Sequence, residues 1–224
     1  NGCWLNDEII NYYMAMLKER DDRKAIFYNT NTTTNTTNTN NTTNSNNSSN
    51  IKTKYLKSHF FNNFFINKLV DNETKSYVYA NVRRWTRKFN IFEMDKIFCP
   101  VNVCNTHWTM AIIYIQKKEI YYYDSMNGSG KKYINGLFQW LQDEHINKLK
   151  TNLPDINQWK LKYGNSNKCP QQSNGIDCGV FSICCADYIS DDLPLIYTQD
   201  DISNFWRIKI ANDILRGTLN YDIL

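Results

Sequence analysis

The chain has 224 residues and a mild net charge of +4, with 26 Lys and Arg against 22 Asp and Glu. Hydrophobic residues make up 42% of it, which is enough to fill one substantial core, so we expect a single domain over 1–224. The basic excess is too small for a dedicated nucleic-acid binder. No apolar run approaches the roughly 18 residues of a membrane span. The chain begins at Asn1 without a methionine, which indicates that it is truncated at its N-terminus.

The seven cysteines are odd in number and irregular in spacing, and no C-x-x-C pair occurs. Only three histidines, at 59, 107 and 145, are available beside them. Zinc sites in proteins use paired ligands at short spacing, so we expect no metal and no other cofactor. Most of the thiols are expected to be small buried side chains in a reducing compartment. One of them is a candidate nucleophile.

Residues 5–19 have the apolar spacing of a helix face, and Asn6 or Asp7 is a suitable N-cap. The apolar positions are Ile10, Tyr13, Met14 and Leu17. From 29 to 50 every residue is Asn, Thr or Ser. Such a stretch cannot bury enough apolar surface to offset the entropy of ordering it, so we expect a disordered insertion at 29–50.

A second helix is expected over 59–70, where Phe61, Phe64, Phe65 and Leu69 form an apolar stripe. Beyond it lies a basic stretch made of Arg83, Arg84, Arg87 and Lys88. Because its charges are few, we interpret this stretch as a solvated or substrate-contacting surface rather than a specific nucleic-acid site.

Strands follow. The run 97–103 is apolar, and 108–115 is apolar on both alternating faces, which predicts a strand covered on both sides. Lys117 and Lys118 can turn the chain into a strand over 120–123. Helices are expected at 131–149, from 178 or 179 to 189, and at 200–219 with Thr198 as the cap. In the last helix we expect four side chains to face inward: Ile202, Phe205, Trp206 and Ile210. Helices around a small mixed sheet define an α+β fold.

The segment 170–179 (PQQSNGIDCG) delivers Cys178 from a polar loop to the first turn of an apolar helix. Free N–H groups and the helix dipole stabilise a thiolate at that position. Gly179 leaves room beside the sulfur for a substrate carbonyl. The backbone N–H of Cys178 and the side-chain amide of Gln172 are candidate donors to an oxyanion. A structural role fits Cys184 and Cys185 better, because both lie in mid-helix.

A nucleophilic thiol needs a base and an orienting group. His107 precedes the first buried strand and Asp124 ends the next one. A turn at the two lysines places Asp124 opposite about Ala111, so a local bend must bring it to His107. The other histidines, in expected helical stretches, have no comparable partner.

Five segments in this order resemble the ubiquitin-like-protein-specific proteases, the sentrin-specific (SENP/Ulp) family of cysteine peptidases. They are 4–11 (WLNDEIIN), 82–86 (VRRWT), 107–108 (HW), 122–126 (YYDSM) and 170–179 (PQQSNGIDCG). The resemblance implies a papain-like variant of the Ulp and adenain type. It also implies a catalytic triad of Cys178, His107 and Asp124 with Gln172 in the oxyanion hole.

The resemblance further implies that Trp4 and Trp108 enclose the Gly-Gly tail of a modifier, and that Asp7 meets a basic residue on the modifier. The expected reaction is cleavage after the C-terminal Gly-Gly of SUMO, in precursors and in isopeptide conjugates with target lysines. The expected partners are SUMO and SUMO-conjugated proteins, with the enzyme a monomer in the nucleus and also in the cytoplasm. The alternatives are the same chemistry on a Nedd-type modifier or ubiquitin, and a non-catalytic SUMO-binding module.

Overall fold

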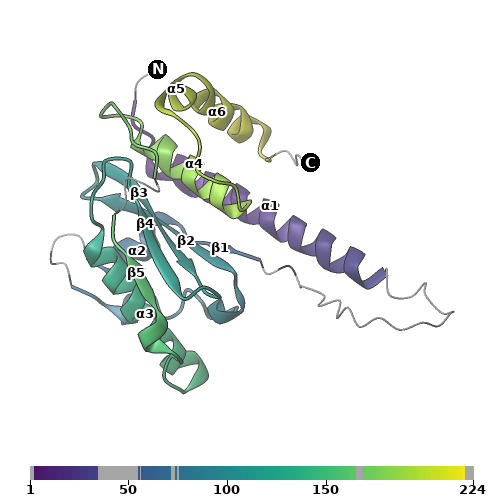
Figure 1. The fold of residues 1–224 in the computed structure, drawn as a ribbon, viewed down its shortest axis with the longest axis vertical. Helices are drawn as coiled ribbons and strands as arrows, with labels where there is room; N and C mark the ends of the chain where they lie inside the picture. Colours follow the sequence, from purple (N-terminus) through teal and green to yellow (C-terminus); the bar gives the residue numbers. More distant parts are fainter. Residues whose placement is uncertain are drawn as a thin grey trace.

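Five strands form one mixed sheet at the centre of the chain, in the order β1-β2-β3-β4-β5 (Figure 1). The computed structural model describes residues 3–34, 55, 57–71, 74, 76–164 and 169–219. The strands are β1 (His59–Phe60), β2 (Lys96–Val103), β3 (His107–Tyr114), β4 (Glu119–Tyr123) and β5 (Lys160–Lys162). The pairs β2·β3 and β3·β4 are antiparallel, while the outer strands β1 and β5 lie parallel to their neighbours.

Helices cover both faces of this sheet (Figure 1). They are α1 (Asp7–Thr34), α2 (Asn63–Leu69), α3 (Lys131–Leu149), α4 (Cys178–Ser190), α5 (Gln199–Asp201) and α6 (Arg207–Arg216). Short 3-10 turns occur at η1 (Tyr79–Asn81), η2 (Ile91–Glu93) and η3 (Ile156–Gln158), and a π-helical turn, η4 (Ile202–Trp206), joins α5 to α6. None of the helices in the described part of the chain is long and apolar enough to cross a membrane.

The two faces of the sheet support two cores. Alternate residues of β3 explain the division: Met110 and Ile112 pack with α1, α4 and the C-terminal helices, while Ala111 and Ile113 pack with α2 and α3. A strand between two helical layers is apolar on both sides, as the sequence of 108–115 predicts. The α+β class with a small mixed sheet is confirmed.

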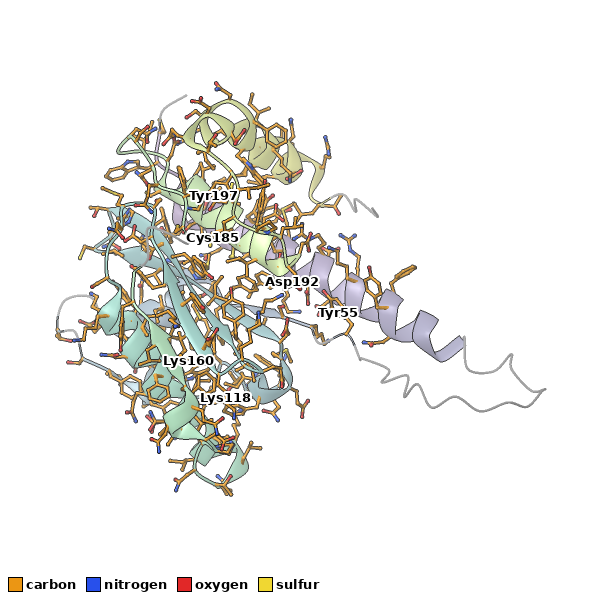
Figure 2. The ribbon with its side chains drawn as sticks, viewed as in Figure 1. Tyr55, Lys118, Lys160, Cys185, Asp192 and Tyr197 are labelled. Atoms are coloured by element: carbon orange, nitrogen blue, oxygen red, sulfur yellow. The ribbon has the colours of Figure 1, made fainter. Side chains whose placement is uncertain are left out.

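Helix α4 lies between the sheet and the outer helices, and every residue of it except Tyr188 is buried. Such a helix is apolar on most of its surface, as its sequence CGVFSICCADYIS is, and its buried Asp187 has a charged partner in Arg20. Figure 2 shows Cys185 of α4 and Tyr197 of the following segment within this packed upper layer. Because α4 is enclosed, its first residue is held firmly against the end of the sheet.

The first helix is longer than predicted and extends into the predicted insertion. Asn6 is the N-cap residue, and its side chain accepts a hydrogen bond from Ile9 N at 3.1 Å. The prediction of disorder from 29 is wrong for 29–34, which continue α1. Asn29 exchanges two hydrogen bonds with the backbone of Tyr55, which stabilises this extension. Residues 35–50 lie outside the described part of the chain.

Two further helix predictions need correction. The helix expected over 59–70 begins only at Asn63, because His59 and Phe60 pair with β2, and Phe64 of the expected stripe is 46% exposed. At the C-terminus Thr198 forms a capping box with Asp201 as expected. The π-helical turn then shifts the phase of the helix, so Phe205 is 57% exposed while Trp206 remains buried. The helix over 131–149 is confirmed.

A buried ion pair joins α1 to α4. Arg20 Nη1 donates to Asp187 Oδ1 at 2.6 Å and Arg20 Nη2 donates to Ser190 Oγ at 2.8 Å, and both members of the ion pair are buried. We predict that Arg20→Met lowers the free energy of unfolding by about 3–5 kcal/mol, because it leaves the Asp187 carboxylate buried and undercompensated. Chemical denaturation measures this change.

The control lies two residues away on the same helix. Lys18 pairs with Asp22 at the surface, so Lys18→Met should change the free energy of unfolding by about 1 kcal/mol or less. Equal losses of unfolding free energy in the two variants would contradict the expectation that the buried pair contributes more to stability than the surface pair.

Candidate active site

Cys178 is the first residue of α4, with a buried side chain. Asp177 precedes it at the N-cap position but makes no side-chain cap hydrogen bond. The first N–H groups of a helix have no acceptor inside the helix, so they surround the sulfur with positive partial charge. The sequence-based placement of Cys178 at the start of a helix is therefore confirmed.

His107 begins β3 and Asp124 directly follows β4, and the sheet brings them together. His107 Nε2 donates to Asp124 Oδ1 at 2.7 Å. The register differs from the prediction, because Tyr123 pairs with Met110 and the loop from 115 to 118 takes up four residues. Asp124 consequently comes two residues closer to His107 than a pairing with Ala111 would place it.

The carboxylate of Asp124 is also fixed by the turn that follows it. Met126 N donates to Oδ1 at 2.8 Å and Gly128 N donates to Oδ2 at 3.0 Å. A Cβ at Gly128 would lie 2.4 Å from Oδ2, so only glycine fits at this position without displacing the carboxylate. These contacts set the orientation of Asp124 and, through it, that of the imidazole ring.

The pKa values of Cys178 and His107 shift in opposite directions. Burial raises the pKa of the Cys178 thiol, but interaction with His107 and backbone hydrogen bonds from Trp108 and Gly179 outweigh it, so the pKa lies below its usual range. Burial lowers the pKa of His107, but Asp124 and Cys178 together raise it to about 9. These shifts favour a thiolate beside an imidazolium.

The second ring nitrogen, Nδ1 of His107, is buried and has no well-aligned hydrogen bond among the described residues. Nε2 is occupied by Asp124. Nδ1 is therefore the ring atom left to exchange a proton with the Cys178 thiol, whose pKa the imidazole lowers. Catalytic hydrogen bonds are often loose before a substrate binds.

The remaining thiols and imidazoles of the described residues are not comparable. Burial raises the pKa of Cys99, Cys169, Cys184 and Cys185, with that of Cys169 reaching about 12. His59 lies in β1 rather than in a helix, and burial lowers its pKa to about 4. His145 Nδ1 contacts Thr151 O at 2.7 Å. No cluster of His, Cys, Asp and Glu suited to a metal ion occurs in this part of the chain.

The two tryptophans that are predicted to enclose a Gly-Gly tail, Trp4 and Trp108, are anchored by their indole N–H groups. Trp4 Nε1 donates to Gly175 O at 2.7 Å, and Trp108 Nε1 donates to Leu5 O at 2.9 Å. Trp4 is 54% exposed, whereas Trp108 is buried. A Cβ at Gly179 would lie 3.0 Å from Leu5 Cβ and 3.3 Å from Trp108 Cδ1. The two anchored segments therefore meet beside the candidate nucleophile.

The other predicted site residues are Gln172 and Asp7. Gln172 is half-buried in the loop before Cys178, and its side-chain amide bonds Ser125 and Asn174. Asp7 is half-buried in the first turn of α1, close in sequence to Trp4, and its carboxylate forms no ion pair within the described residues.

Sequence reasoning missed Arg207 at the start of α6. Its Nε donates to Asp177 Oδ1 at 2.7 Å, Nη2 donates to Ile176 O at 3.1 Å, and Nη1 donates to Cys3 O at 3.1 Å. One guanidinium thus joins the loop before Cys178 to the segment that carries Trp4. Arg207 and Asp177 are 30 residues apart, so no local pattern could have connected them.

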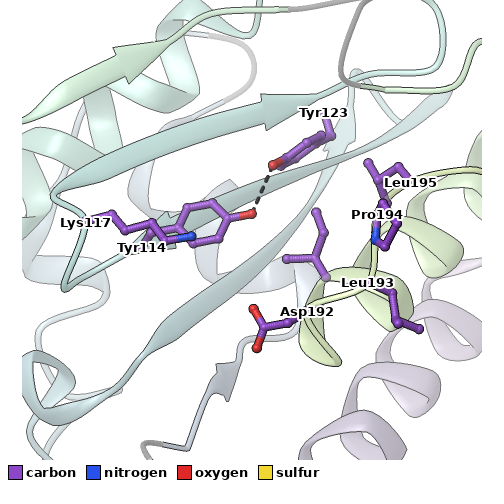
Figure 3. Close-up of a pocket in the computed structure, with 8 residues that line it drawn as sticks. Tyr114, Lys117, Tyr123, Asp192, Leu193, Pro194 and Leu195 are labelled. Carbon is purple, nitrogen blue, oxygen red and sulfur yellow. Dashed lines mark hydrogen bonds between the residues drawn. The ribbon is translucent and has the colours of Figure 1, made fainter.

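A hollow of about 350 Å³ lies at the far end of β3 and is separate from these residues (Figure 3). Tyr114, Lys117 and Tyr123 line one side, and residues 192–195 line the other. Tyr114 is seven residues along β3 from His107, or about 23 Å at the rise of a strand. The hollow contains no member of the candidate triad.

A thiol at a helix N-terminus, an imidazole and a carboxylate in series define a cysteine protease domain. The sequence model described as "Ulp1 protease family, C-terminal catalytic domain" matches residues 32–218. The chain therefore belongs to the Ulp1 protease family.

Curated relatives and solved structures agree with this assignment. Ubiquitin-like-specific protease 1A of Arabidopsis thaliana is 36% identical over 96% of this chain, and human sentrin-specific protease 2 is 35% identical over 98%. The chain spans 37% and 31% of those relatives, respectively. A crystal structure of the C-terminal Ulp1 protease domain in complex with Smt3, the yeast orthologue of SUMO, is 30% identical with a TM-score of 0.64, over 96% of this chain and 77% of that one.

The opposed pKa shifts predict the pH dependence of kcat/KM toward a modifier substrate. In the expected mechanism, activity needs the Cys178 thiolate and a proton on His107. It should therefore rise at a pH below the usual thiol range and fall as His107 loses its proton near about 9. A pH–rate profile checks both limbs. Activity that instead begins to rise only near the ordinary thiol pKa of about 8.5 would contradict the ion pair.

The close approach of Gly128 to Asp124 predicts that a single methyl group added at residue 128 strongly lowers activity. Gly128→Ala should lower kcat by about tenfold or more, because the added Cβ displaces the carboxylate that orients His107. Ser129→Ala is the control, since Ser129 is exposed on the same turn. Steady-state kinetics on both variants measure the difference. Unchanged activity in Gly128→Ala would show that the carboxylate tolerates displacement.

Proposed function

We propose that this chain is the catalytic domain of a SUMO-specific cysteine protease, which cleaves after the C-terminal Gly-Gly of SUMO. The observation that carries the proposal is the 2.7 Å hydrogen bond between His107 and Asp124 beside a thiol whose pKa lies below its usual range. The relative solved with Smt3 bound supports SUMO as the modifier. Precursor maturation and deconjugation from lysines are both reactions of this site.

In the proposed mechanism, the Cys178 thiolate attacks the carbonyl carbon of the terminal glycine. The oxyanion that forms accepts hydrogen bonds from the Cys178 N–H and from the Gln172 amide. Protonated His107 gives its proton to the leaving amine as the C–N bond breaks, which leaves a thioester on Cys178. Neutral His107 then takes a proton from water, which attacks the thioester and releases the glycine carboxylate.

Trp4 and Trp108 are proposed to form the walls through which the Gly-Gly tail reaches Cys178. Their indole N–H groups bond Gly175 O and Leu5 O, which fixes the two rings on the segments that meet beside Cys178. Only residues without side chains pass between closely spaced indoles, which explains selection of a diglycine terminus. Asp7 is proposed to meet a basic residue on the folded body of the modifier.

The Gly-Gly tail does not separate SUMO from a Nedd-type protein or ubiquitin, because all of them end in it. The curated relatives of this chain include a sentrin-specific protease, which favours SUMO. A non-catalytic SUMO-binding module is disfavoured, because each position of the triad is occupied by a competent residue. We propose that the enzyme acts as a monomer, in the nucleus and also in the cytoplasm.

A panel of modifiers with C-terminal electrophilic traps tests this function. We predict that the SUMO trap forms a covalent adduct at Cys178, and that ubiquitin and Nedd-type traps react at least tenfold more slowly. Mass spectrometry identifies the modified residue. Cys178→Ala should form no adduct and hydrolyse no SUMO precursor, yet still bind SUMO in a pull-down.

Two outcomes would overturn the proposal. Faster capture by the ubiquitin or Nedd-type trap would change the modifier while retaining the chemistry. Hydrolysis by Cys178→Ala within a few-fold of the parent would exclude Cys178 as the nucleophile.

A further inference from the structure

The turn after β4 and the loop before Cys178 are joined by three hydrogen bonds. Gln172 N donates to Ser125 O at 2.9 Å, and Gln171 Nε2 donates to Asp124 O at 3.0 Å. Ser125 Oγ donates to Gln172 Oε1 at 2.6 Å. Ser125 is buried, and it is the residue that directly follows the candidate triad carboxylate. Two of these three bonds therefore converge on Ser125.

The side-chain amide of Gln172 is fixed at both ends. Its oxygen accepts from Ser125 Oγ, and its nitrogen donates to Asn174 O. An amide nitrogen has two N–H bonds, so one remains free after the bond to Asn174. A flipped amide would place its oxygen against the carbonyl oxygen of Asn174, and neither atom could donate. Asn174 therefore selects which end of the amide is the donor end.

Ser125 determines where that amide lies. Gln172 is only half-buried, and its long side chain has many rotamers open to solvent. The hydroxyl of Ser125 binds the amide oxygen, which restricts these rotamers while the second N–H of the amide keeps its capacity to donate. A donor to the oxygen of an amide also polarises it and strengthens its N–H groups as donors.

We propose that Ser125 is a positioning residue for catalysis, acting through Gln172 as the donor to the oxyanion. This inference rests on the proposed function, in which Gln172 stabilises the developing charge. It also explains why the segment that ends β4 matters beyond Asp124. Residue 124 orients the base, and residue 125 orients the oxyanion donor, so one turn aligns two parts of the site.

The test is a double-mutant cycle of Ser125→Ala and Gln172→Ala, with hydrolysis of a SUMO precursor as the readout. Loss of one oxyanion donor lowers kcat by about 10²–10³-fold in a comparable enzyme, and we expect Gln172→Ala to approach this range. Ser125→Ala should lower kcat about tenfold or more, with KM within about twofold. The double variant should be no slower than Gln172→Ala alone, because Ser125 has no other route to the reaction.

Alkylation of Cys178 by iodoacetamide separates this role from a structural one. Alkylation is a displacement at carbon that forms no oxyanion, so it depends on the thiolate and His107 but not on Gln172. Its rate in Ser125→Ala should remain within about twofold of the parent. Ser125→Thr, which keeps the hydroxyl, should recover most of the lost kcat in the precursor assay.

The contradicting outcomes can be told apart. Multiplicative losses in the double variant, or slowed alkylation in Ser125→Ala, would show that Ser125 acts on the fold or on Asp124, and would overturn the inference. Full activity in Ser125→Ala alongside an impaired Gln172→Ala would do the same while leaving the proposed function intact. Failure of the parent chain to hydrolyse a SUMO precursor would instead overturn the proposed function.

Discussion

The hydrogen bond between His107 and Asp124 depends on where two neighbouring strands end. His107 is the first residue of β3 and Asp124 is the first residue after β4, so the antiparallel pairing of these strands sets the distance between the two side chains. A shift of register by one residue would move every side chain of the strand to the opposite face of the sheet. Because both faces are packed against helices, such a shift would disrupt both cores. The two cores thus hold the candidate base and its orienting group in place.

The same packing fixes the partner thiol. Helix α4 is enclosed between the sheet and the outer helices, and Cys178 begins it. Arg207 bonds Asp177 in the loop before it and also reaches the N-terminal segment through Cys3 O. Residues from the two ends of the domain therefore meet at the loop that precedes Cys178. The exposed Trp4 is part of this arrangement, since its indole bonds the same loop at Gly175.

Much of this could be predicted from the sequence where the determinants are local. The apolar pattern and the loop before it place Cys178 at a helix start, and periodicity alone defines α3 from 131 to 149. Predictions failed where partners are distant or where a helix is interrupted. His59 and Phe60 join the sheet only because β2 lies beside them, and Phe205 turns outward only because a π-helical turn intervenes. Arg207 could not be found, because its contacts with Asp177 and Cys3 exist only in the folded chain.

The central claim is that Cys178 is held as a thiolate by His107, and its reactivity with pH tests this most directly. Cys3 and Cys104 are exposed thiols in the same chain and serve as internal references. Labelling with iodoacetamide across a range of pH, followed by peptide mass spectrometry, gives a rate for each cysteine. The account predicts that Cys178 is labelled rapidly at a pH where Cys3 and Cys104 hardly react, and that His107→Ala removes this advantage. Labelling of Cys178 that follows the same pH dependence as the two exposed thiols would contradict it.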